Sequence, residues 1–215
     1  MKIRLIYFNI PFWRAEVSRI ALYIGDIPFE DVRIKGDDFS YIKENGKMKD
    51  GTIIPFRQLP VIEVNGHIIA QTASIARFCG KLSGLYPNDN SILAGQVDQV
   101  IDTATDINLL LRPSMKEEDP IKKLHLRKEL SNGDMPKYLN YLEQILMKNK
   151  SDQWFVGGKM TIADIAIWRL TGWLTSGIID GLSKDLLKNS PLLAKLCEDV
   201  SNNSKVIKWV KKTYP

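Results

Sequence analysis

The sequence has few of the residues that build metal centres and reactive thiol sites. It contains two cysteines, Cys79 and Cys197, and two histidines, His67 and His125. Cysteines this far apart form neither a CxxC motif nor a cysteine-rich zinc site, and their scarcity is typical of a reducing compartment. No HExxH or G-x-S-x-G motif accompanies the histidines. We therefore expect no metal site, and we interpret both histidines as ordinary surface or core residues.

Long apolar runs are also missing. The longest run without an acidic or basic residue, 64–76, is shorter than the roughly 20 apolar residues that a membrane-spanning helix needs. Near the N-terminus, Arg4, Pro11 and Arg14 interrupt what a signal peptide would need as an unbroken apolar segment. The sequence therefore predicts a cytoplasmic protein without a membrane segment.

The remaining composition is that of a globular protein with a modest positive charge. Of 215 residues, 44% are hydrophobic and 26% are charged, and the net charge is +5. Basic residues are denser at 43–49, 122–128 and 205–212, but these stretches have helical spacing and are not interleaved with aromatics like a nucleic-acid platform. We interpret them as solvated helix faces and expect no nucleic-acid partner.

Strand and helix patterns alternate through residues 1–82. Residues 2–7 have the period of a strand, apolar residues recur at helical spacing over 17–24, and 29–34 has the pattern of a second strand. A strand, a helix and a strand this close together predict a parallel βαβ unit. Asn65-Gly66 is a strong hairpin signal, and it predicts a ββα unit after the first. The elements predicted after residue 34 are a short helix, a flexible polar loop, two strands and an amphipathic helix, at 37–43, 44–56, 60–64, 67–70 and 72–82.

Helical patterns dominate the second half of the chain. Residues 83–90 are rich in turn formers and predict a linker between two domains. Further helices are predicted at about 119–150, 161–176 and 191–212. The sequence thus predicts an α/β domain over 1–82 followed by an all-helical domain over 91–215. The first helix after the linker carries an apolar stripe formed by Val97, Val100, Ile101, Ala104 and Ile107.

Four short motifs, each weak alone, occur in order along the chain. They are Leu5-Ile-Tyr7-Phe8-Asn9 followed by Arg14-Ala-Glu, Gln58-Leu-Pro60-Val-Ile-Glu-Val-Asn-Gly, Gln71-Thr72-Ala-Ser-Ile-Ala-Arg, and Thr161-Ile-Ala-Asp164. At these separations they make the sequence resemble the cytosolic glutathione S-transferases over nearly the whole chain. The resemblance implies a thioredoxin-like N-terminal domain (βαβ-ββα) and a helical C-terminal domain.

Two segments bear on the class within that family. Tyr7-Phe8-Asn9 with Arg14-Ala-Glu, and the segment 97–103, look most like the sigma class. The sequence departs from that class at 44–56, where the loop is several residues longer, and at 11–13, where one residue is inserted.

Tyr7 is the residue that the resemblance identifies as catalytic. Judged from the strand alone, Tyr7 is more simply a core tyrosine. The family uses a tyrosine at this position to donate a hydrogen bond to the glutathione sulfur, which favours the nucleophilic thiolate. Arg14 is either an ordinary residue at a helix start or, as the resemblance implies, a positive charge that favours the thiolate further.

The resemblance also implies a set of glutathione contacts. In it, the backbone of Leu59, beside a cis Pro60, pairs with the cysteinyl segment, and Gln58 adds a side-chain contact. Gln71 and Thr72 hold the γ-glutamyl end, which suits a helix N-terminus, although Thr72 is alternatively a plain N-cap. The remaining contacts are Phe39, Lys43 and Asp106.

These remaining contacts have alternative interpretations. Lys43 contacts the glycyl carboxylate in the family pattern but is otherwise a solvated lysine. Phe39 stands where sigma-like members usually carry tryptophan, so an indole N–H donor is lost. Asp106 reaches across a homodimer interface to the γ-glutamyl amine of the partner's ligand, or else it is an exposed acid.

An electrophile pocket completes the implied site, and it is lined by Phe12, Trp13, Leu110, Arg112 and Met115.

We therefore expect a homodimeric transferase that takes glutathione as co-substrate, attacks hydrophobic electrophiles and needs no metal. A glutathione-dependent isomerase of the prostaglandin-synthase kind and a non-enzymatic ligand-binding protein are the alternatives. A thiol-disulfide oxidoreductase is disfavoured because neither cysteine lies near the start of the first helix. Thr161 and Asp164 have capping-box spacing, which predicts a structural role.

Overall fold

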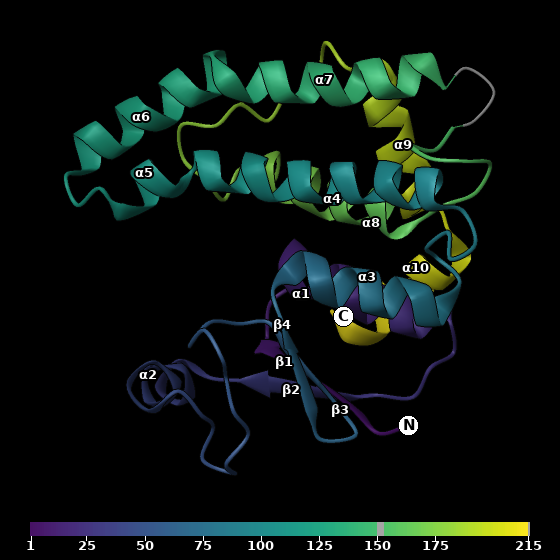
Figure 1. Cartoon of the computed structure of the whole chain (residues 1–215). Helices are drawn as coiled ribbons and strands as arrows, with labels where there is room; N and C mark the ends of the chain where they lie inside the picture. The colour runs from purple at the N-terminus through teal and green to yellow at the C-terminus, as the bar shows by residue number, and fades with distance from the viewer. Residues whose placement is uncertain (150–152, 215) are drawn as a thin grey trace.

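The computed structural model describes residues 1–149 and 153–214, in which a small α/β domain lies against a layer of long helices (Figure 1). The N-terminal domain is built on a four-stranded sheet of order β2-β1-β3-β4. Its elements in chain order confirm the predicted βαβ-ββα arrangement. They are β1 (Ile3–Phe8), α1 (Trp13–Ile24), β2 (Glu30–Ile34), α2 (Gly36–Asn45), β3 (Val61–Val64), β4 (His67–Ala70) and α3 (Thr72–Ser83).

β1 is a central strand of this sheet. It pairs with β2 in parallel, after the crossover through α1, and with β3 in antiparallel. The hairpin between β3 and β4 turns at Asn65 and Gly66, whose φ angles are 48° and 84°. Positive φ at both central residues is what a two-residue hairpin turn of type I′ requires. The turn therefore sets the register in which Val64 lies opposite His67.

The C-terminal domain is helical throughout its described residues. The predicted apolar stripe on its first helix is confirmed, since all five side chains are 0% exposed. No helix in the described ranges is both long and apolar enough to cross a membrane. The helices are α4 (Ser91–Leu110), α5 (Arg112–Lys116), α6 (Pro120–Asn132), α7 (Asp134–Lys148), α8 (Ile162–Leu174), α9 (Pro191–Ser201) and α10 (Ser204–Thr213).

Two of the predicted long helices are each divided in the structure. The helix expected over 119–150 is α6 and α7, separated at Gly133, where the backbone leaves helical values (φ −113°, ψ −97°); position 150 lies outside the described residues. The helix expected over 191–212 is α9 and α10. The break there is local, because the Asn203 side chain accepts hydrogen bonds from the first-turn N–H groups of α10. Hydrophobic periodicity missed both breaks because helical spacing continues on each side of them.

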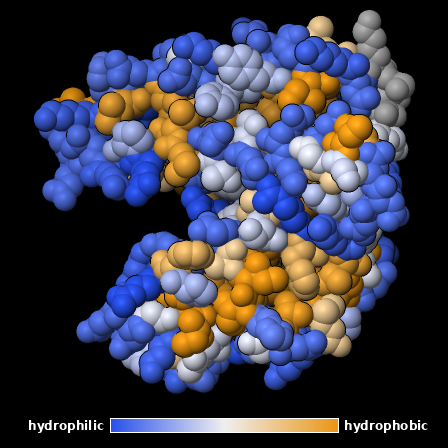
Figure 2. Space-filling view, in the orientation of Figure 1, coloured by the Kyte–Doolittle hydropathy of each residue, from blue (hydrophilic) through white to orange (hydrophobic). Residues whose placement is uncertain are grey.

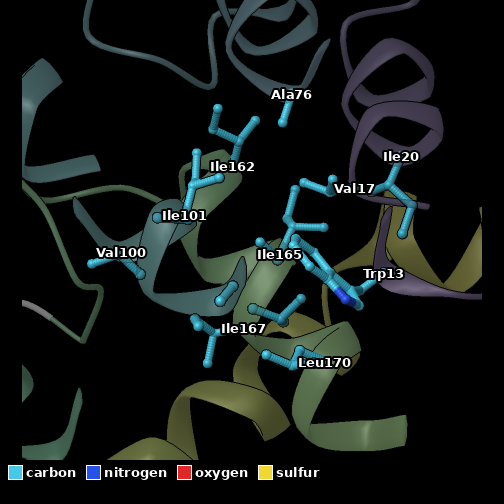
Figure 3. Packing of buried hydrophobic residues seen from close by; sticks show 14 of the residues in the cluster. Trp13, Val17, Ile20, Ala76, Val100, Ile101, Ile162, Ile165, Ile167 and Leu170 are labelled. Carbon is cyan, nitrogen blue, oxygen red and sulfur yellow. The ribbon is translucent and has the colours of Figure 1, made fainter. Parts of the chain in front are cut away.

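One apolar core spans both domains. α1 packs against α3 within its own domain and against α8 of the other. Trp13 and Val17 of α1 lie in the same buried cluster as Ile162 and Ile165 of α8 (Figure 3). Burying a large aliphatic side chain contributes about 1.5–3 kcal/mol. The two domains are therefore held together by the same hydrophobic burial that stabilises each of them.

The segment between α2 and β3, expected to be a flexible loop, is tied to the sheet. Arg4 on β1 donates hydrogen bonds to Asp50 at 2.8 Å and to Thr52 at 3.1 Å. Hydrogen bonds from the Thr52 backbone and side chain, together with Arg4, lower the pKa of Asp50 to about 2. The carboxylate is therefore charged at all ordinary pH values and holds the loop beside the strand that ends at the site.

α8 begins with a buried capping box, as its sequence spacing predicts. The Thr161 side chain accepts a hydrogen bond from the Ala163 N–H, while Asp164 accepts from the N–H groups of Phe155 and Thr161 at 2.9 and 2.6 Å. Asp164 is 0% exposed, and burial raises its pKa to about 6 although these hydrogen bonds lower it. The carboxylate thus joins the start of α8 to the chain that precedes it.

Replacing this carboxylate by its isosteric amide should destabilise the fold. In Asp164→Asn, one oxygen remains for two buried N–H donors, so the free energy of unfolding should fall by about 2 kcal/mol. Urea unfolding followed by circular dichroism measures this loss. Thr161→Ser keeps the hydroxyl and should change it by less than about 1 kcal/mol. Equal stability of Asp164→Asn and the parent protein would show that the box is dispensable.

Candidate functional site

A cavity of about 460 Å³ lies at the junction of the two domains. Figure 2 shows the surface deeply notched there, with hydrophilic side chains at the inner end. One wall comes from the segment before β3 and the start of α3, and the other from the end of α4 and from α5. The lining residues are Arg14, Phe56, Gln58, Leu59, Pro60, Ala70, Gln71, Thr72, Asn108, Leu109, Leu111, Arg112 and Met115.

The wall next to the sheet is built by the segment leading into β3. Gln58, Leu59 and Pro60 all line the cavity. The Leu59–Pro60 peptide bond is cis, as the sequence comparison with the family predicted. Leu59 also packs into the smaller of the two apolar clusters, together with Tyr7. The backbone of Leu59 is therefore placed between the cavity and the end of β1.

α3 presents an unusual start to the same cavity. Gln71 is the N-cap, with φ 76° and ψ 125°, and its side chain makes no capping hydrogen bond. Thr72 is the first helical residue, so the interpretation of Thr72 as N-cap is wrong. A non-glycine residue at positive φ stores strain that is common at ligand sites. A helix N-terminus without a side-chain cap is suited to hold a carboxylate.

Tyr7 lies behind this wall, near the end of β1. Its side chain is 4% exposed, and burial raises the pKa of Tyr7 to about 12, although the positive charges of Arg14 and Arg19 oppose the shift. The phenol is therefore protonated at neutral pH and available as a hydrogen-bond donor. Within the described part of the chain its hydroxyl has no protein partner and is not a fully buried atom.

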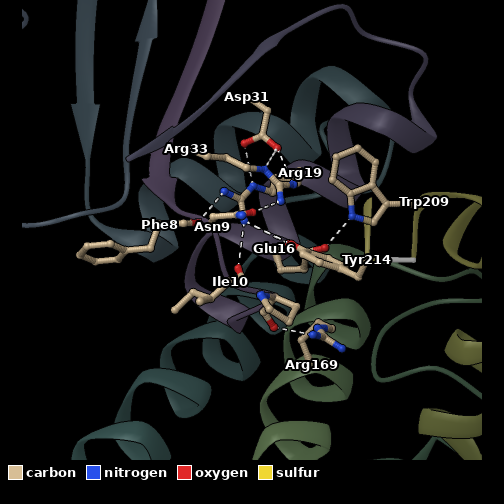
Figure 4. Close-up of polar contacts among 11 residues, drawn as sticks. Phe8, Asn9, Ile10, Glu16, Arg19, Asp31, Arg33, Arg169, Trp209 and Tyr214 are labelled. Atoms are coloured by element: carbon tan, nitrogen blue, oxygen red, sulfur yellow. Dashed lines mark hydrogen bonds and ion pairs between the residues drawn. The ribbon is translucent and has the colours of Figure 1, made fainter. Parts of the chain in front are cut away.

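The turn that follows Tyr7 is held by a buried arginine that sequence reasoning missed. Arg19 on α1 is 0% exposed and donates to the carbonyl oxygens of Phe8 and Ile10 at 3.1 and 3.2 Å. Its charge is balanced by Asp31 at 2.9 Å and Glu16 at 3.3 Å (Figure 4). The turn between β1 and α1 is therefore fixed by buried charge-assisted hydrogen bonds, and Arg14, in the first turn of α1, lines the cavity just beyond it.

The C-terminal segment completes this cluster. The Trp209 indole N–H and the Tyr214 hydroxyl both donate to Glu16, at 2.5 and 2.7 Å. Arg33, on β2, donates to Asp31 at 2.8 Å. Glu16 and Arg19 lie one helical turn apart on α1, but no pattern within that helix shows that the C-terminal segment returns to cover them.

Comparison with known proteins assigns the family. The family profile described as "Glutathione S-transferase, N-terminal domain" matches residues 3–80, and that described as "Glutathione S-transferase, C-terminal domain" matches residues 105–213. The chain belongs to the glutathione S-transferase family. Glutathione S-transferases are enzymes that take glutathione as a substrate, and this chain is one of them.

The similar proteins include both glutathione S-transferases and prostaglandin D synthases by name. Glutathione S-transferase 1 of Ascaris suum is 31% identical, with 96% of this chain and 94% of that protein covered. Hematopoietic prostaglandin D synthase of Gallus gallus is also 31% identical, with 97% and 95% covered. The solved structure of prostaglandin synthase D of Nilaparvata lugens has a TM-score of 0.84 and 28% identity, with 100% and 99% covered.

Two residues that the family pattern assigns to glutathione lie on α2, outside the cavity wall. The Phe39 ring meets the edge of Phe8, with 4.9 Å between centroids. The Lys43 ammonium stands 5.1 Å from the centroid of Phe39. The rings of Tyr7, Phe8 and Phe39 thus contact one another in turn, and the Lys43 ammonium lies at the end of this series. The contacts of Phe39 and Lys43 with glutathione stay predictions.

Asp106 lies exposed on α4 and makes no ion pair with any described residue. The acids that precede it on the same helix are engaged, since Asp98 and Asp102 both bind Arg77 of α3, at 2.6 and 2.8 Å. Asp106 is therefore a carboxylate on this part of α4 that no described basic side chain pairs with, and its contact with a partner subunit's ligand stays a prediction.

The cavity wall formed by α4 and α5 differs in part from the electrophile pocket that the sequence predicts. Arg112 and Met115 line the cavity as expected, but Leu110 does not, whereas its neighbours Leu109 and Leu111 do. Trp13 is 0% exposed in the core, so its assignment to the pocket is wrong: the first turn of α1 directs it inward. Phe12 packs against Trp173, with 4.8 Å between centroids, and does not line the cavity. Asn108 and Phe56 line it without having been predicted.

Removing the buried charge beside the site should destabilise this transferase strongly. Arg19→Met leaves Asp31 and Glu16 without their shared cation, so the free energy of unfolding should fall by about 3–5 kcal/mol. Urea unfolding measures the change. The matched control is Arg33→Met, which removes a half-buried partner of the same Asp31 and should cost no more than about 1 kcal/mol. Similar losses in the two variants would contradict the role given to Arg19.

Proposed function

We propose that the protein binds reduced glutathione in the cavity, stabilises its thiolate through Tyr7, and transfers the sulfur to a hydrophobic electrophile held against α4 and α5. The observation that carries this proposal is the protonated Tyr7 hydroxyl, which has no partner among the described residues and shares a cluster with Leu59 beside the cavity. We place this activity in the cytoplasm, where thiols are kept reduced.

The segment before β3 and the start of α3 supply the groups that bind a tripeptide thiol. The backbone of Leu59 pairs with the cysteinyl segment, and Gln58 contacts the same tripeptide. The γ-glutamyl carboxylate lies at the start of α3 with Gln71 and Thr72, where first-turn N–H groups favour negative charge. Lys43 attracts the glycyl carboxylate at the other end, and Phe39 packs beside it.

Thiol ionisation is the main chemical contribution of the site. A free thiol has a pKa near 8.5, so only a few per cent is thiolate at neutral pH. The Tyr7 O–H donates a hydrogen bond to the sulfur, and the Arg14 guanidinium adds positive charge; both favour the thiolate. A decrease of about two pKa units corresponds to about 2.7 kcal/mol and makes the thiolate the main species.

The protein's own cysteines do not compete for this role. Burial raises the pKa of Cys79 to about 12 and that of Cys197 to about 11. Thiols with such pKa values are poor nucleophiles at neutral pH. This supports a bound thiol as the reacting group and disfavours a thiol-disulfide oxidoreductase.

An isomerase is the second candidate. It is favoured by the full-length similarity to proteins named prostaglandin D synthase in Gallus gallus and Nilaparvata lugens. Such a reaction uses the same activated thiolate, so the residues on the glutathione side are the same. The two candidates differ in which molecule the wall formed by α4 and α5 accepts.

The bound thiol gives the first test of the proposal. In Tyr7→Phe the hydrogen bond to sulfur is lost, so glutathione should still bind while the pKa of its thiol rises by one unit or more and turnover falls at least tenfold, on the order of 1.4 kcal/mol. Ultraviolet absorbance of the thiolate during a pH titration measures the pKa. A thiol pKa equal in the variant and the parent protein would remove Tyr7 from the mechanism.

The second test concerns a homodimer, in which Asp106 contacts the partner's glutathione. Asp106→Ala should weaken glutathione binding about tenfold, because a charge-assisted hydrogen bond is lost, and should leave the dimer intact. Calorimetric titration measures the affinity, and analytical ultracentrifugation at the same concentration measures the assembly. A monomeric parent protein, or unchanged affinity in a dimeric variant, would refute this assignment.

A further inference from the structure

The orientation of one polar side chain on the cavity wall is fixed by the core behind it. Trp13 is 0% exposed, and an indole nitrogen can only donate a hydrogen bond. Its acceptor is the Asn108 side-chain oxygen, at 2.7 Å. Because a wholly buried N–H group requires an acceptor, the oxygen of Asn108 must face the core. The amide nitrogen is then the part of Asn108 that remains for the cavity, and it has no partner among the described residues.

A second donor lines the same wall just beyond the end of α4. α4 ends at Leu110, but Leu111 keeps right-handed helical angles (φ −76°, ψ −16°) before α5 begins at Arg112. Asn108, near the end of α4, and Arg112, at the start of α5, both line the cavity. Among the described residues Arg112 makes no ion pair.

The rest of this wall is apolar. Leu109, Leu111 and Met115 line the cavity from the same two helices, and no acidic side chain is among the residues that line it. Arg14, across the cavity, adds another cation. The wall thus offers apolar surface with hydrogen-bond donors and positive charge, which complements a molecule with a hydrophobic body and an anionic oxygen group.

We infer that Asn108 and Arg112 select, as second substrate, an apolar electrophile that carries a carboxylate. This inference rests on the proposed glutathione chemistry and specifies the molecule which that chemistry attacks. The Asn108 amide N–H and the Arg112 guanidinium donate to the carboxylate, while Leu109, Leu111 and Met115 contact the apolar body. Asn108 acts as a specificity-determining residue because Trp13 holds its amide in the donating orientation.

A matched pair of probes tests the inference directly. Ethacrynic acid is an apolar α,β-unsaturated ketone with a carboxylate, and its methyl ester keeps the reactive group without the charge. In Arg112→Gln, kcat/KM for the acid should fall tenfold or more, while kcat/KM for the ester should change less than threefold. Lys116→Gln removes a cation from the same short helix but away from the cavity, and it should leave both values unchanged.

The same comparison tests Asn108. Asn108→Asp keeps an oxygen for the Trp13 N–H but replaces the amide donor by negative charge, so the acid should lose at least tenfold in kcat/KM and the ester less than threefold. Asn108→Ser, which is uncharged and smaller, provides a second variant if the aspartate destabilises the fold. The KM for glutathione should be unchanged in each variant.

Two results would overturn the inference. One is an equal loss for acid and ester in these variants; the other is failure of the parent enzyme to turn over the acid. The pKa of bound glutathione separates these results from failure of the proposed function. If that pKa is lowered, the thiolate chemistry stands and only the substrate assignment fails; if it equals the free value, the proposed function fails and the inference fails with it.

Discussion

The buried Arg19 guanidinium is the interaction on which the geometry of the site depends. A cation removed from water is tolerated only where carboxylates and carbonyl oxygens satisfy it, and here Glu16, Asp31 and the carbonyls of Phe8 and Ile10 do so. The same contacts fix the end of β1 and the turn into α1. Tyr7 precedes that turn and Arg14 follows it, so the position of both depends on one buried charge.

The two sides of the cavity are held together by a shared core. One side comes from the sheet domain and the other from α4 and α5, and the two domains are joined by the core that α1 shares with α8. Preorganised groups contribute most to catalysis when nothing must move to bring them together. A shared core also explains why Trp13, at the start of α1, reaches Asn108 on α4 and controls which atom of its amide faces the ligand.

Much of the fold and part of the site could be predicted from the sequence. The Asn65-Gly66 turn, the stripe from Val97 to Ile107 and the capping box at Thr161 are local patterns, in which residues close in sequence contact each other, and the structure confirms them. The cis peptide bond at Pro60 came from family resemblance, because no local pattern specifies it.

The features that were missed depend on contacts between distant residues. Gly133 breaks a helix whose periodicity continues beyond it, and Trp13 turns inward because α4 and α8 cover it. Arg19 is an ordinary helical arginine in the sequence, and its surroundings become buried only when the chain returns after α10, with Tyr214 lying 195 residues beyond it. Contacts between residues so far apart leave no pattern in a short stretch of sequence, so they could not be predicted from it.

The closure of this cluster by α10 also has a consequence for synthesis on the ribosome. The N-terminal domain contributes Glu16, but the donors that satisfy it, Trp209 and Tyr214, are translated 193 and 198 residues after it. Until Trp209 and Tyr214 have been synthesised, the Glu16 carboxylate, which is buried in the folded protein, is exposed to water beside an incomplete core. The first domain therefore reaches its native packing only after α10 and Tyr214 have been made, and the turn between β1 and α1 is completed long after its own residues are synthesised.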